Sequence, residues 1–417
     1  MNDISAEEHD IYDVLIAGGG LVGGSLALAL AGTGSRVALI EAVPPESDAQ
    51  PSFDDRTLAL SRGSYRILNQ LGLWPRLTNS IWPVQQIHIS QQGAFGTALI
   101  DAAEQGVDEL GFVIKSSALG KALWQQLREV PNLTIFCPAK VIATDTQADL
   151  RSVEIETDSG PRTLHTRLLA VADGARSRLR TELGIAADER NYEQVAVVAN
   201  VQIDPRRSGC VAYERFTNEG PLALLPGADG QCTVVLARHS DNVQAVLDMP
   251  DAELLTLLQS LLGFRLGRLQ RIGQRQAYPL YLVTAEQVIA ERAVLIGNAA
   301  HGLHPVAAQG FNLGLRDVAA LAETINDELQ RAAGSPDVGS PELLQTYADW
   351  RQADQRKVVE FTDGLIRLFG VSGDAASALR GISLSAFDIL PPVKRELARQ
   401  TMGLAGRMSR LARGLPL

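Results

Sequence analysis

The stretch that decides the fold is "YDVLIAGGGLVGGSLALALAGTGSRVALIEA", which runs from Tyr12 to Ala42. Its first segment, "YDVLIA", is a short apolar run that ends in glycines, and this pattern predicts a buried strand. The segment after it is rich in Ala and Leu and predicts a helix that closes at Gly32 and Gly34, and "RVALIEA" predicts a second buried strand. Continuous apolar strands joined by a helix are typical of a parallel sheet covered on both faces. The sequence therefore predicts an α/β domain built on this unit.

The turn between the first strand and the helix carries the pattern G-x-G-x-x-G. Gly18 would permit the tight turn, Gly20 would let a pyrophosphate approach the backbone, and Gly23 would let the helix pack closely on the strand. The helix N-terminus supplies N–H groups and partial positive charge for the phosphates. Glu41 ends the second strand, where a carboxylate accepts ribose hydroxyls and disfavours a 2′-phosphate. These residues predict a site for FAD or NAD in preference to NADP.

Two further segments carry a resemblance to a known class of enzymes. "VADGARSRLR" places Asp173 directly after a buried strand, and "AVLIGNAAHGLHPVAAQGFNLG" spans Ala293 to Gly314. Together with the glycine turn, they resemble the class A flavoprotein aromatic hydroxylases. Within that class, "DDRTLALS", "YERFTNEGPLALLP" and "HPVAAQGFNLGLRD" are similar to the ubiquinone-biosynthesis hydroxylases, above all to the 2-polyprenyl-6-methoxyphenol hydroxylases. The resemblance covers nearly the whole chain and is weakest at its two ends.

The resemblance implies FAD as the cofactor and adds residues that hold it. Besides the glycine turn, Glu41 and Asp173, the predicted cofactor-binding residues are Arg56, Gly297, Asn298, Gln309, Gly310, Phe311 and Asn312. The family has Asp where this chain has Asn298, and Asn keeps an acceptor oxygen but loses the charge. The helix that begins near Gly310 would aim its N-terminus at the flavin and stabilise the negative charge of its reduced form.

The reaction is likewise implied by the resemblance, because the chain shows no Ser/His/Asp arrangement, metal set or P-loop, and the chemistry is assigned to the cofactor. NAD(P)H would reduce FAD, and a flavin C4a-hydroperoxide formed with O2 would hydroxylate the ring of a polyprenylated phenol. The pocket candidates are Arg56, Tyr213, Phe216, His304 and Pro305. Tyr213 and Phe216 fit a core role equally well. His301 and His304 lack a third ligand, so a role in lining the pocket or in packing is favoured over metal binding.

The domain organisation is expected to be discontinuous. Residues 1–80, 106–184 and 285–335 are predicted to form a Rossmann-like FAD-binding domain of the para-hydroxybenzoate-hydroxylase type. Residues 81–105 and 185–284 are predicted to form an inserted substrate domain on an antiparallel sheet, and residues 336–417 a C-terminal helical region. The segment from Arg56 to Trp74 has a helical pattern and is predicted as a helix.

Charge and hydropathy bound the location and the partners. The net charge of −10 argues against non-specific nucleic-acid binding. The acidic start lacks the features of a secretory signal, and no apolar run reaches the ~20 residues of a membrane span, so a cytoplasmic location is expected. Near the C-terminus, apolar residues on one helical face and six cations predict a helix that lies on the inner face of the membrane; the apolar residues are Leu397, Leu404, Met408, Leu411 and Leu415. Packing on the second domain is the alternative.

Other functions fit the same fold. A halogenase or epoxidase is disfavoured, because the Trp-rich motif and the lysine usual in halogenases are not found. A non-catalytic flavoprotein scaffold of a ubiquinone-biosynthesis complex, and a hydroxylase of another hydrophobic phenol, stay open. Membership of a biosynthetic complex and homo-oligomerisation are also left open by the sequence.

Overall fold

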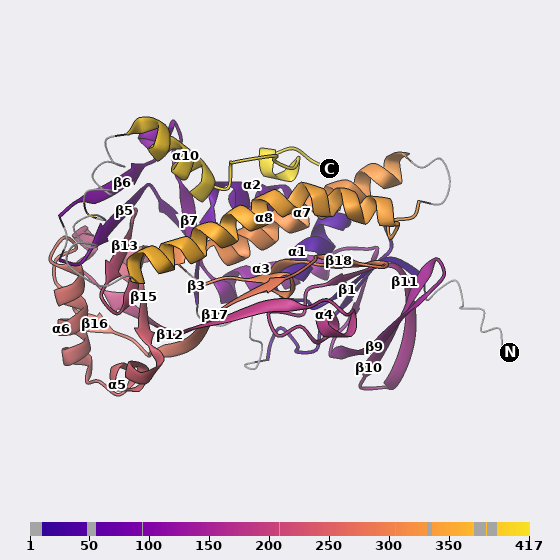
Figure 1. Cartoon of the computed structure of the whole chain (residues 1–417), viewed down its shortest axis with the longest axis horizontal. Coiled ribbons are helices and arrows are strands. Elements are labelled where there is room, and N and C mark those ends of the chain that lie inside the picture. The colour runs from indigo at the N-terminus through magenta and orange to yellow at the C-terminus, as the bar shows by residue number, and fades with distance from the viewer. Residues whose placement is uncertain are drawn as a thin grey trace.

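A computed structural model describes residues 11–47, 56–93, 95–207, 209–304, 306–331, 336–370, 381 and 390–417. Two large sheets and one small sheet lie at its centre, and two long helices run across them (Figure 1). One large sheet contains the strands that flank the glycine turn, and the other contains the strands expected in the substrate domain. The predicted combination of a Rossmann-like domain with a second, largely antiparallel sheet is confirmed.

The first large sheet has a parallel core. In spatial order its core strands are β19 (Ala293–Leu295), β11 (Gly160–Val171), β1 (Ile11–Ala17), β2 (Val37–Ile40) and β8 (Leu133–Phe136), all parallel to their neighbours. Antiparallel additions at its margins are β9 (Ala139–Gln147), β10 (Leu150–Thr157) and β18 (Ile289–Ala290). The four residues of β2 are all buried, as expected for a strand covered on both faces. The helices α1 (Leu21–Leu30), α3 (Ser116–Leu127) and α4 (Arg178–Glu182) accompany this sheet.

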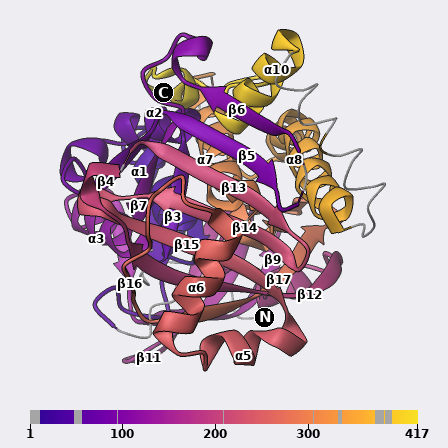
Figure 2. The same ribbon diagram turned by 90° about the vertical axis from the view of Figure 1, so that its left-hand side faces the viewer.

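The second large sheet is antiparallel except for one strand pair, β13 with β5. In spatial order its strands are β20 (His301–Gly302), β17 (Gln276–Ala285), β12 (Ala187–Gln202), β15 (Gln231–His239), β14 (Gly220–Pro226), β13 (Val211–Thr217), β5 (Gln86–Gln91) and β6 (Thr97–Asp101), with β16 (Arg271–Ile272) beside β12. The helices α5 (Val243–Leu247) and α6 (Asp251–Leu262) pack on its outer face, as Figure 2 shows. Its opposite, inner face lines a cavity.

A small third sheet corrects one prediction. The segment expected as a single helix begins as β3 (Thr57–Ser61), which pairs along its whole length with β7 (Gly111–Lys115), and only then forms α2 (Arg62–Gln70). β4 (Ile81–Val84) pairs with the other edge of β7. The prediction was wrong because pairing with a distant strand outweighs the local helical pattern.

The two long helices α7 (Gln309–Arg331) and α8 (Pro341–Gly370) lie side by side across the molecule (Figure 1). Leu315, Val318 and Leu321 on α7 are fully buried in the main core, which they share with α1. The N-terminus of α7 therefore has a fixed position relative to the glycine turn.

The C-terminal segment corrects the expectation of one long amphipathic helix. The helix α10 (Pro391–Thr401) stops where Gly403 and Gly406 adopt positive φ, and only a short turn, η9 (Leu411–Arg413), follows. Leu411 is 3% exposed and packs in the main core. Leu397 and Leu404 pack beside β5 and β6, as the alternative of packing on the second domain expects, whereas Met408 packs against the main core and Leu415 is 48% exposed.

No helix in the described ranges combines the length and the apolar character that a membrane span needs.

Candidate active site

A cavity of about 1000 Å³ lies between the inner face of the antiparallel sheet and the glycine turn. Elements from both large sheets line it: the start of α1, the 296–312 segment, and strands β12 to β15. β3 and β7 close a third side, and most of the lining is apolar. The glycine turn and the inner face of the antiparallel sheet thus line the same cavity.

The glycine turn has the close approach that its pattern predicts. Gly18 has a φ of 109°, and a Cβ there would lie 2.5 Å from the carbonyl oxygen of Ala172. A Cβ on Gly23 would lie 1.9 Å from the carbonyl oxygen of Gly18, so neither position accepts a side chain without movement of the backbone. Gly20, between them, lines the cavity. The backbone of this turn is open to a phosphate group.

Glu41 holds the turn from the end of β2. Its Oε2 accepts a hydrogen bond from the Gly19 N–H at 2.6 Å, and its Oε1 accepts one from the Val43 N–H at 2.8 Å. An ionised carboxylate offers about four acceptor sites, so these bonds leave capacity for ribose hydroxyls. The role of Glu41 toward ribose stays a prediction.

Asn298 lies where β19 gives way to the turn η7 (Gly297–Ala299). Its side chain is exposed and lines the cavity, and none of the described residues makes a hydrogen bond to its amide. Gly297, with a φ of 58°, and Gly314 both lie close to Val22. A Cβ added to them would lie 3.0 and 2.9 Å, respectively, from a methyl carbon of Val22. Glycine at both positions lets this segment approach α1 closely and presents Asn298 to the cavity.

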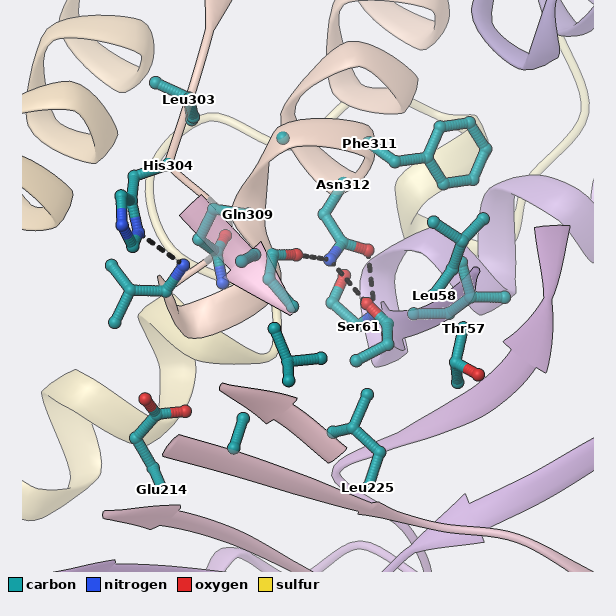
Figure 3. Close-up of a pocket in the computed structure, with 18 of the residues that line it drawn as sticks. Thr57, Leu58, Ser61, Glu214, Leu225, Leu303, His304, Gln309, Phe311 and Asn312 are labelled. Carbon is teal, nitrogen blue, oxygen red and sulfur yellow. Dashed lines mark hydrogen bonds between the residues drawn. The ribbon is translucent and has the colours of Figure 1, made fainter. Parts of the chain in front are cut away.

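The start of α7 carries the other predicted cofactor residues. A Cβ added to Gly310 would meet no described atom within 4 Å, so the cavity continues past it. Gln309 and Phe311 also line the cavity, and Figure 3 shows how they lie. Pro305, the remaining pocket candidate of this segment, lies outside the described residues.

Asn312 fixes the N-terminus of α7 to the small sheet. Its Oδ1 accepts from the Ser61 N–H at 2.8 Å and from the Ser64 hydroxyl at 2.7 Å. Its Nδ2 donates to the carbonyl oxygens of Ala59 and Ala308 at 2.9 and 2.6 Å (Figure 3). These four bonds use the side-chain amide, so any contact of Asn312 with a cofactor would come from its backbone.

Asp173 lies beside the cavity but outside its lining. Its carboxylate accepts from the Leu179 N–H at 3.4 Å, at the N-terminus of α4. Arg180, on the same helix, donates to the carbonyl oxygens of Ala175 and Ala299, both at 3.1 Å. The motif that contains Asp173 thereby ties the end of β11 to the turn that presents Asn298.

Arg56 and the first histidine have different surroundings. Arg56 lines the cavity with its guanidinium 4.9 Å from the centre of the Tyr278 ring. His301 is buried, and its Nε2 lies 2.5 Å from Oδ2 of Asp317 on α7. No group of three or more potential metal ligands occurs among the described residues, and His301 serves an internal polar cluster.

His304 is the histidine that reaches the cavity. Its ring meets the Tyr192 ring edge-on at 5.3 Å, and its Nδ1 accepts from the Val306 N–H at 3.1 Å. Burial lowers the pKa of His304 to about 4, so the ring is neutral near pH 7. With Nδ1 as an acceptor, Nε2 carries the proton, and Nε2 has no hydrogen-bond partner in the described structure.

The β13 strand contains a residue that sequence reasoning missed. Phe216, one of the predicted pocket residues, lines the cavity. Tyr213 packs against the hydrophobic cluster between the sheet and α5 and α6, with its ring centre 5.6 Å from that of His88, and part of its side chain also lines the cavity. Glu214 also lines the cavity (Figure 3). The alternation of a strand places residues two apart on one face, so Phe216 on the inner face would have pointed to Glu214.

Comparisons with known proteins agree with this geometry. A family model described as "FAD binding domain" matches residues 11–362. The ubiquinone hydroxylase UbiL of Rhodospirillum rubrum is 34% identical over 417 residues, which cover 99% of this chain and 95% of that protein. The 3-demethoxyubiquinol 3-hydroxylase of Escherichia coli is 30% identical over 404 residues, which cover 94% of this chain and 98% of the other.

The fold is shared with a solved aromatic hydroxylase. The p-nitrophenol 4-monooxygenase PnpA of Pseudomonas putida superposes with a TM-score of 0.77 at 22% identity, over 95% of this chain and 99% of its own. The glycine turn, the space beside Gly310 and the unbonded Asn298 amide fit the pyrophosphate and polar groups of FAD. The chain therefore belongs to the FAD-binding family of flavoprotein hydroxylases, in the group that contains the ubiquinone hydroxylases.

Proposed function

We propose that this protein is an FAD-dependent monooxygenase that uses NAD(P)H and O2 to hydroxylate the aromatic ring of a polyprenylated phenol in ubiquinone biosynthesis. The observation that carries the proposal is the single cavity. Glycine turns of the FAD-binding type and an apolar antiparallel sheet line the same space. A flavin held by one wall would therefore face a ring held by the other.

The shape of the cavity supports a substrate with an apolar tail. Away from the glycine turn, the lining continues to α8 and α10 through Phe361, Leu365 and Leu397. These side chains offer no hydrogen bonds and would exclude water from an isoprenoid chain. The aromatic head would then lie near β13 and the start of α7.

FAD, when bound, supplies electron transfer from NAD(P)H and activation of O2. The protein's own task is to bind, orient and exclude water. We assign the pyrophosphate to the backbone around Gly18 and Gly20, the ribose to Glu41, and a polar group of the ribityl chain to Asn298. The N–H groups at the start of α7, near Gly310, are assigned to the flavin ring, where they favour negative charge.

We also propose that α10 touches a membrane surface while the enzyme takes up its substrate. Val393 on this helix and Leu390 directly before it are 52% and 51% exposed, and Leu368, which lines the cavity together with Leu397 of α10, is 52% exposed. A prenylated phenol is dissolved in lipid, so an apolar mouth at a bilayer would shorten its transfer. Replacing Leu390 and Val393 by Glu should reduce co-sedimentation with anionic vesicles and leave the FAD content unchanged. Equal co-sedimentation of the two proteins would contradict this contact.

The experiment that tests the function uses the purified holoenzyme with NAD(P)H, 18O2 and a short-chain prenylated phenol. The expected product is the hydroxylated phenol with one 18O atom, measured by mass spectrometry. If NAD(P)H is oxidised but the phenol is recovered unchanged, or if nothing is oxidised, the enzyme assignment is wrong and the scaffold alternative gains support. A panel of unprenylated hydrophobic phenols tests whether the tail is required.

A further inference from the structure

Glu214 stands on an otherwise apolar wall. Its neighbours across the sheet are Ile89 on β5 and Ala223 on β14, and its neighbours on the same face of β13 are Ala212 and Phe216. All of them line the cavity with Glu214. A carboxylate at the centre of an apolar sheet face breaks the local pattern, and such breaks are typical of functional positions.

The carboxylate finds no hydrogen-bond partner among the residues that the structure describes. Its Oε1 is shielded from solvent and finds no hydrogen-bond donor among the described residues. Figure 3 shows the side chain extending from β13 toward the wall that carries His304 and Gln309. Glu214 as a whole is half-buried, but a shielded carboxylate oxygen without a partner is unfavourable. A hydrogen-bond donor on a ligand in the cavity would supply the missing partner.

None of the other ionisable groups described in the cavity lining pairs with Glu214. The Arg56 guanidinium lies over Tyr278, His304 is neutral near pH 7, and burial raises the pKa of Tyr213 above its ordinary value. Burial is the only cause that acts on the pKa of Glu214, and it raises that pKa to about 7. The group can therefore exchange a proton under physiological conditions.

We infer that Glu214 binds the ring hydroxyl of the phenol substrate and takes up its proton while the ring is hydroxylated. The inference rests on the proposed function. The O–H bond of the phenol breaks, a bond from hydrogen to a Glu214 oxygen forms, and the electron pair stays on the phenol oxygen and spreads into the ring. The ring carbon that receives oxygen becomes more nucleophilic. When the ring regains aromaticity, the C–H bond of the hydroxylated carbon breaks and its hydrogen leaves as a proton, which is used in forming water from the second oxygen atom of O2. Glu214 returns the first proton to the phenol oxygen and is a carboxylate again.

The binding test compares the holoenzyme with its Glu214→Gln variant, using a short-chain prenylated phenol and the methyl ether of the same phenol. Changes in the flavin absorbance report the dissociation constants from pH 5 to pH 9. The phenol should bind wild-type protein about ten- to a hundredfold more tightly above pH 7 than below it, because a charge-assisted hydrogen bond forms. The Gln variant should lose this pH dependence, and the ether should show none with either protein.

The turnover test uses the same variants. In the wild type, kcat for hydroxylation should rise as the pH passes through about 7, because only the ionised carboxylate accepts the proton. Glu214→Gln should lower kcat by about a hundredfold or more and flatten the profile, with unchanged FAD content and unchanged reduction of the flavin by NAD(P)H. Glu214→Asp should recover part of the rate. Glu253→Gln, an exposed position at the start of α6, is the matched control and should behave as wild type.

Two results overturn the inference in different ways. If Glu214→Gln retains the wild-type kcat and pH profile, or if the ether shows the same pH-dependent binding as the phenol, Glu214 does not handle the proton. If wild-type protein forms no hydroxylated product from any phenol tested, the proposed function fails and the inference fails with it.

Discussion

Asp317 and Glu214 are two carboxylates inside the same molecule, and their surroundings are opposite. Asp317, on α7, is fully buried; it contacts His301 at 2.5 Å and accepts from Arg351 at 2.8 Å and from Gln355 at 3.1 Å. Although burial alone would raise the pKa of Asp317, its partners His301 and Arg351 hold that pKa well below its usual range. Glu214, for which the described part of the chain offers no hydrogen-bond partner, has its pKa raised by burial to about 7.

The difference indicates that the Asp317 carboxylate stabilises the fold, whereas the Glu214 carboxylate is available to a ligand. The Asp317 cluster joins β20, through His301, to α7 and α8. The Asp317 carboxylate is met there by His301, Arg351 and Gln355 from other parts of the chain, so it has its partners without a ligand. The Glu214 carboxylate has no such partners among the described residues, and it faces the space where the substrate is proposed to bind.

The largest expected effect is on the paired carboxylate. Asp317→Ala should lower the free energy of unfolding by about 3–5 kcal/mol, because it leaves Arg351 buried without its partner. Because the folded pKa of Asp317 is depressed, its contribution is present above pH ~4 and is lost as the pH falls below that value. Urea denaturation measures both effects. Asp349→Ala, at an exposed position of α8, is the control; an Asp317 variant as stable as this control would show that the cluster does not hold the helices.

The next effect should have the opposite sign. The pKa of Glu214 is raised in the folded protein, so the stability of the wild type is highest below the unfolded pKa and falls as the pH rises through about 7. Glu214→Gln removes this loss and should be more stable than wild type at pH 8 by at most about 3 kcal/mol, with little difference at pH 4. Thermal unfolding across this pH range makes the comparison. A Gln variant that is less stable at pH 8 would mean that the carboxylate has a partner after all.

Glu41 lies between these extremes, with two backbone donors and capacity for more. Glu41→Ala should weaken FAD binding by about 1.5–3 kcal/mol, the value of a charge-assisted hydrogen bond. Equilibrium dialysis of the variant against FAD gives the affinity. If the variant binds FAD as tightly as the wild type, Glu41 only holds the glycine turn. Denaturation of the wild type should release FAD, and release of FMN alone would refute the dinucleotide site.

Asn298 provides the smallest test, because its amide is neutral and open to the cavity. Asn298→Leu should weaken FAD binding by about 1–3 kcal/mol, since a polar group of the cofactor would be left unpaired. Asn298→Asp should retain both FAD and activity, because the acceptor oxygen stays at the same reach. Tight FAD retention by the Leu variant would show that Asn298 does not contact the cofactor.

The sequence predicts these two kinds of region unequally. The glycine turn could be predicted because its signals are local: an apolar run, fixed glycine spacing and an acid at the end of the next strand. The strand β3 could not, because its pairing with β7 is made across the fold. The C-terminal helix was extended too far because a periodic pattern continued past Gly403, where the backbone turns.

Glu214 was missed for a different reason. The sequence of one strand shows which of its residues share a face of the sheet. Which face points inward depends on the neighbouring strands, which pair Glu214 with Ile89 of β5 and Ala223 of β14. The Asp317 cluster was invisible for the same reason, since Arg351 belongs to another helix. Local chemistry is thus readable from the chain, whereas the presence or absence of a partner requires the fold.

The most direct test of this account is the titration of Glu214 itself in the holoenzyme. Infrared difference spectra between successive pH values report the carbonyl stretch of protonated carboxyl groups, and the Glu214→Gln variant identifies the band of this residue. The account predicts a band that disappears around pH 7 in the wild type and is absent from the variant. A wild type whose spectra match those of the variant between pH 5 and pH 9 would contradict it, because Glu214 would then be ionised throughout and paired like Asp317.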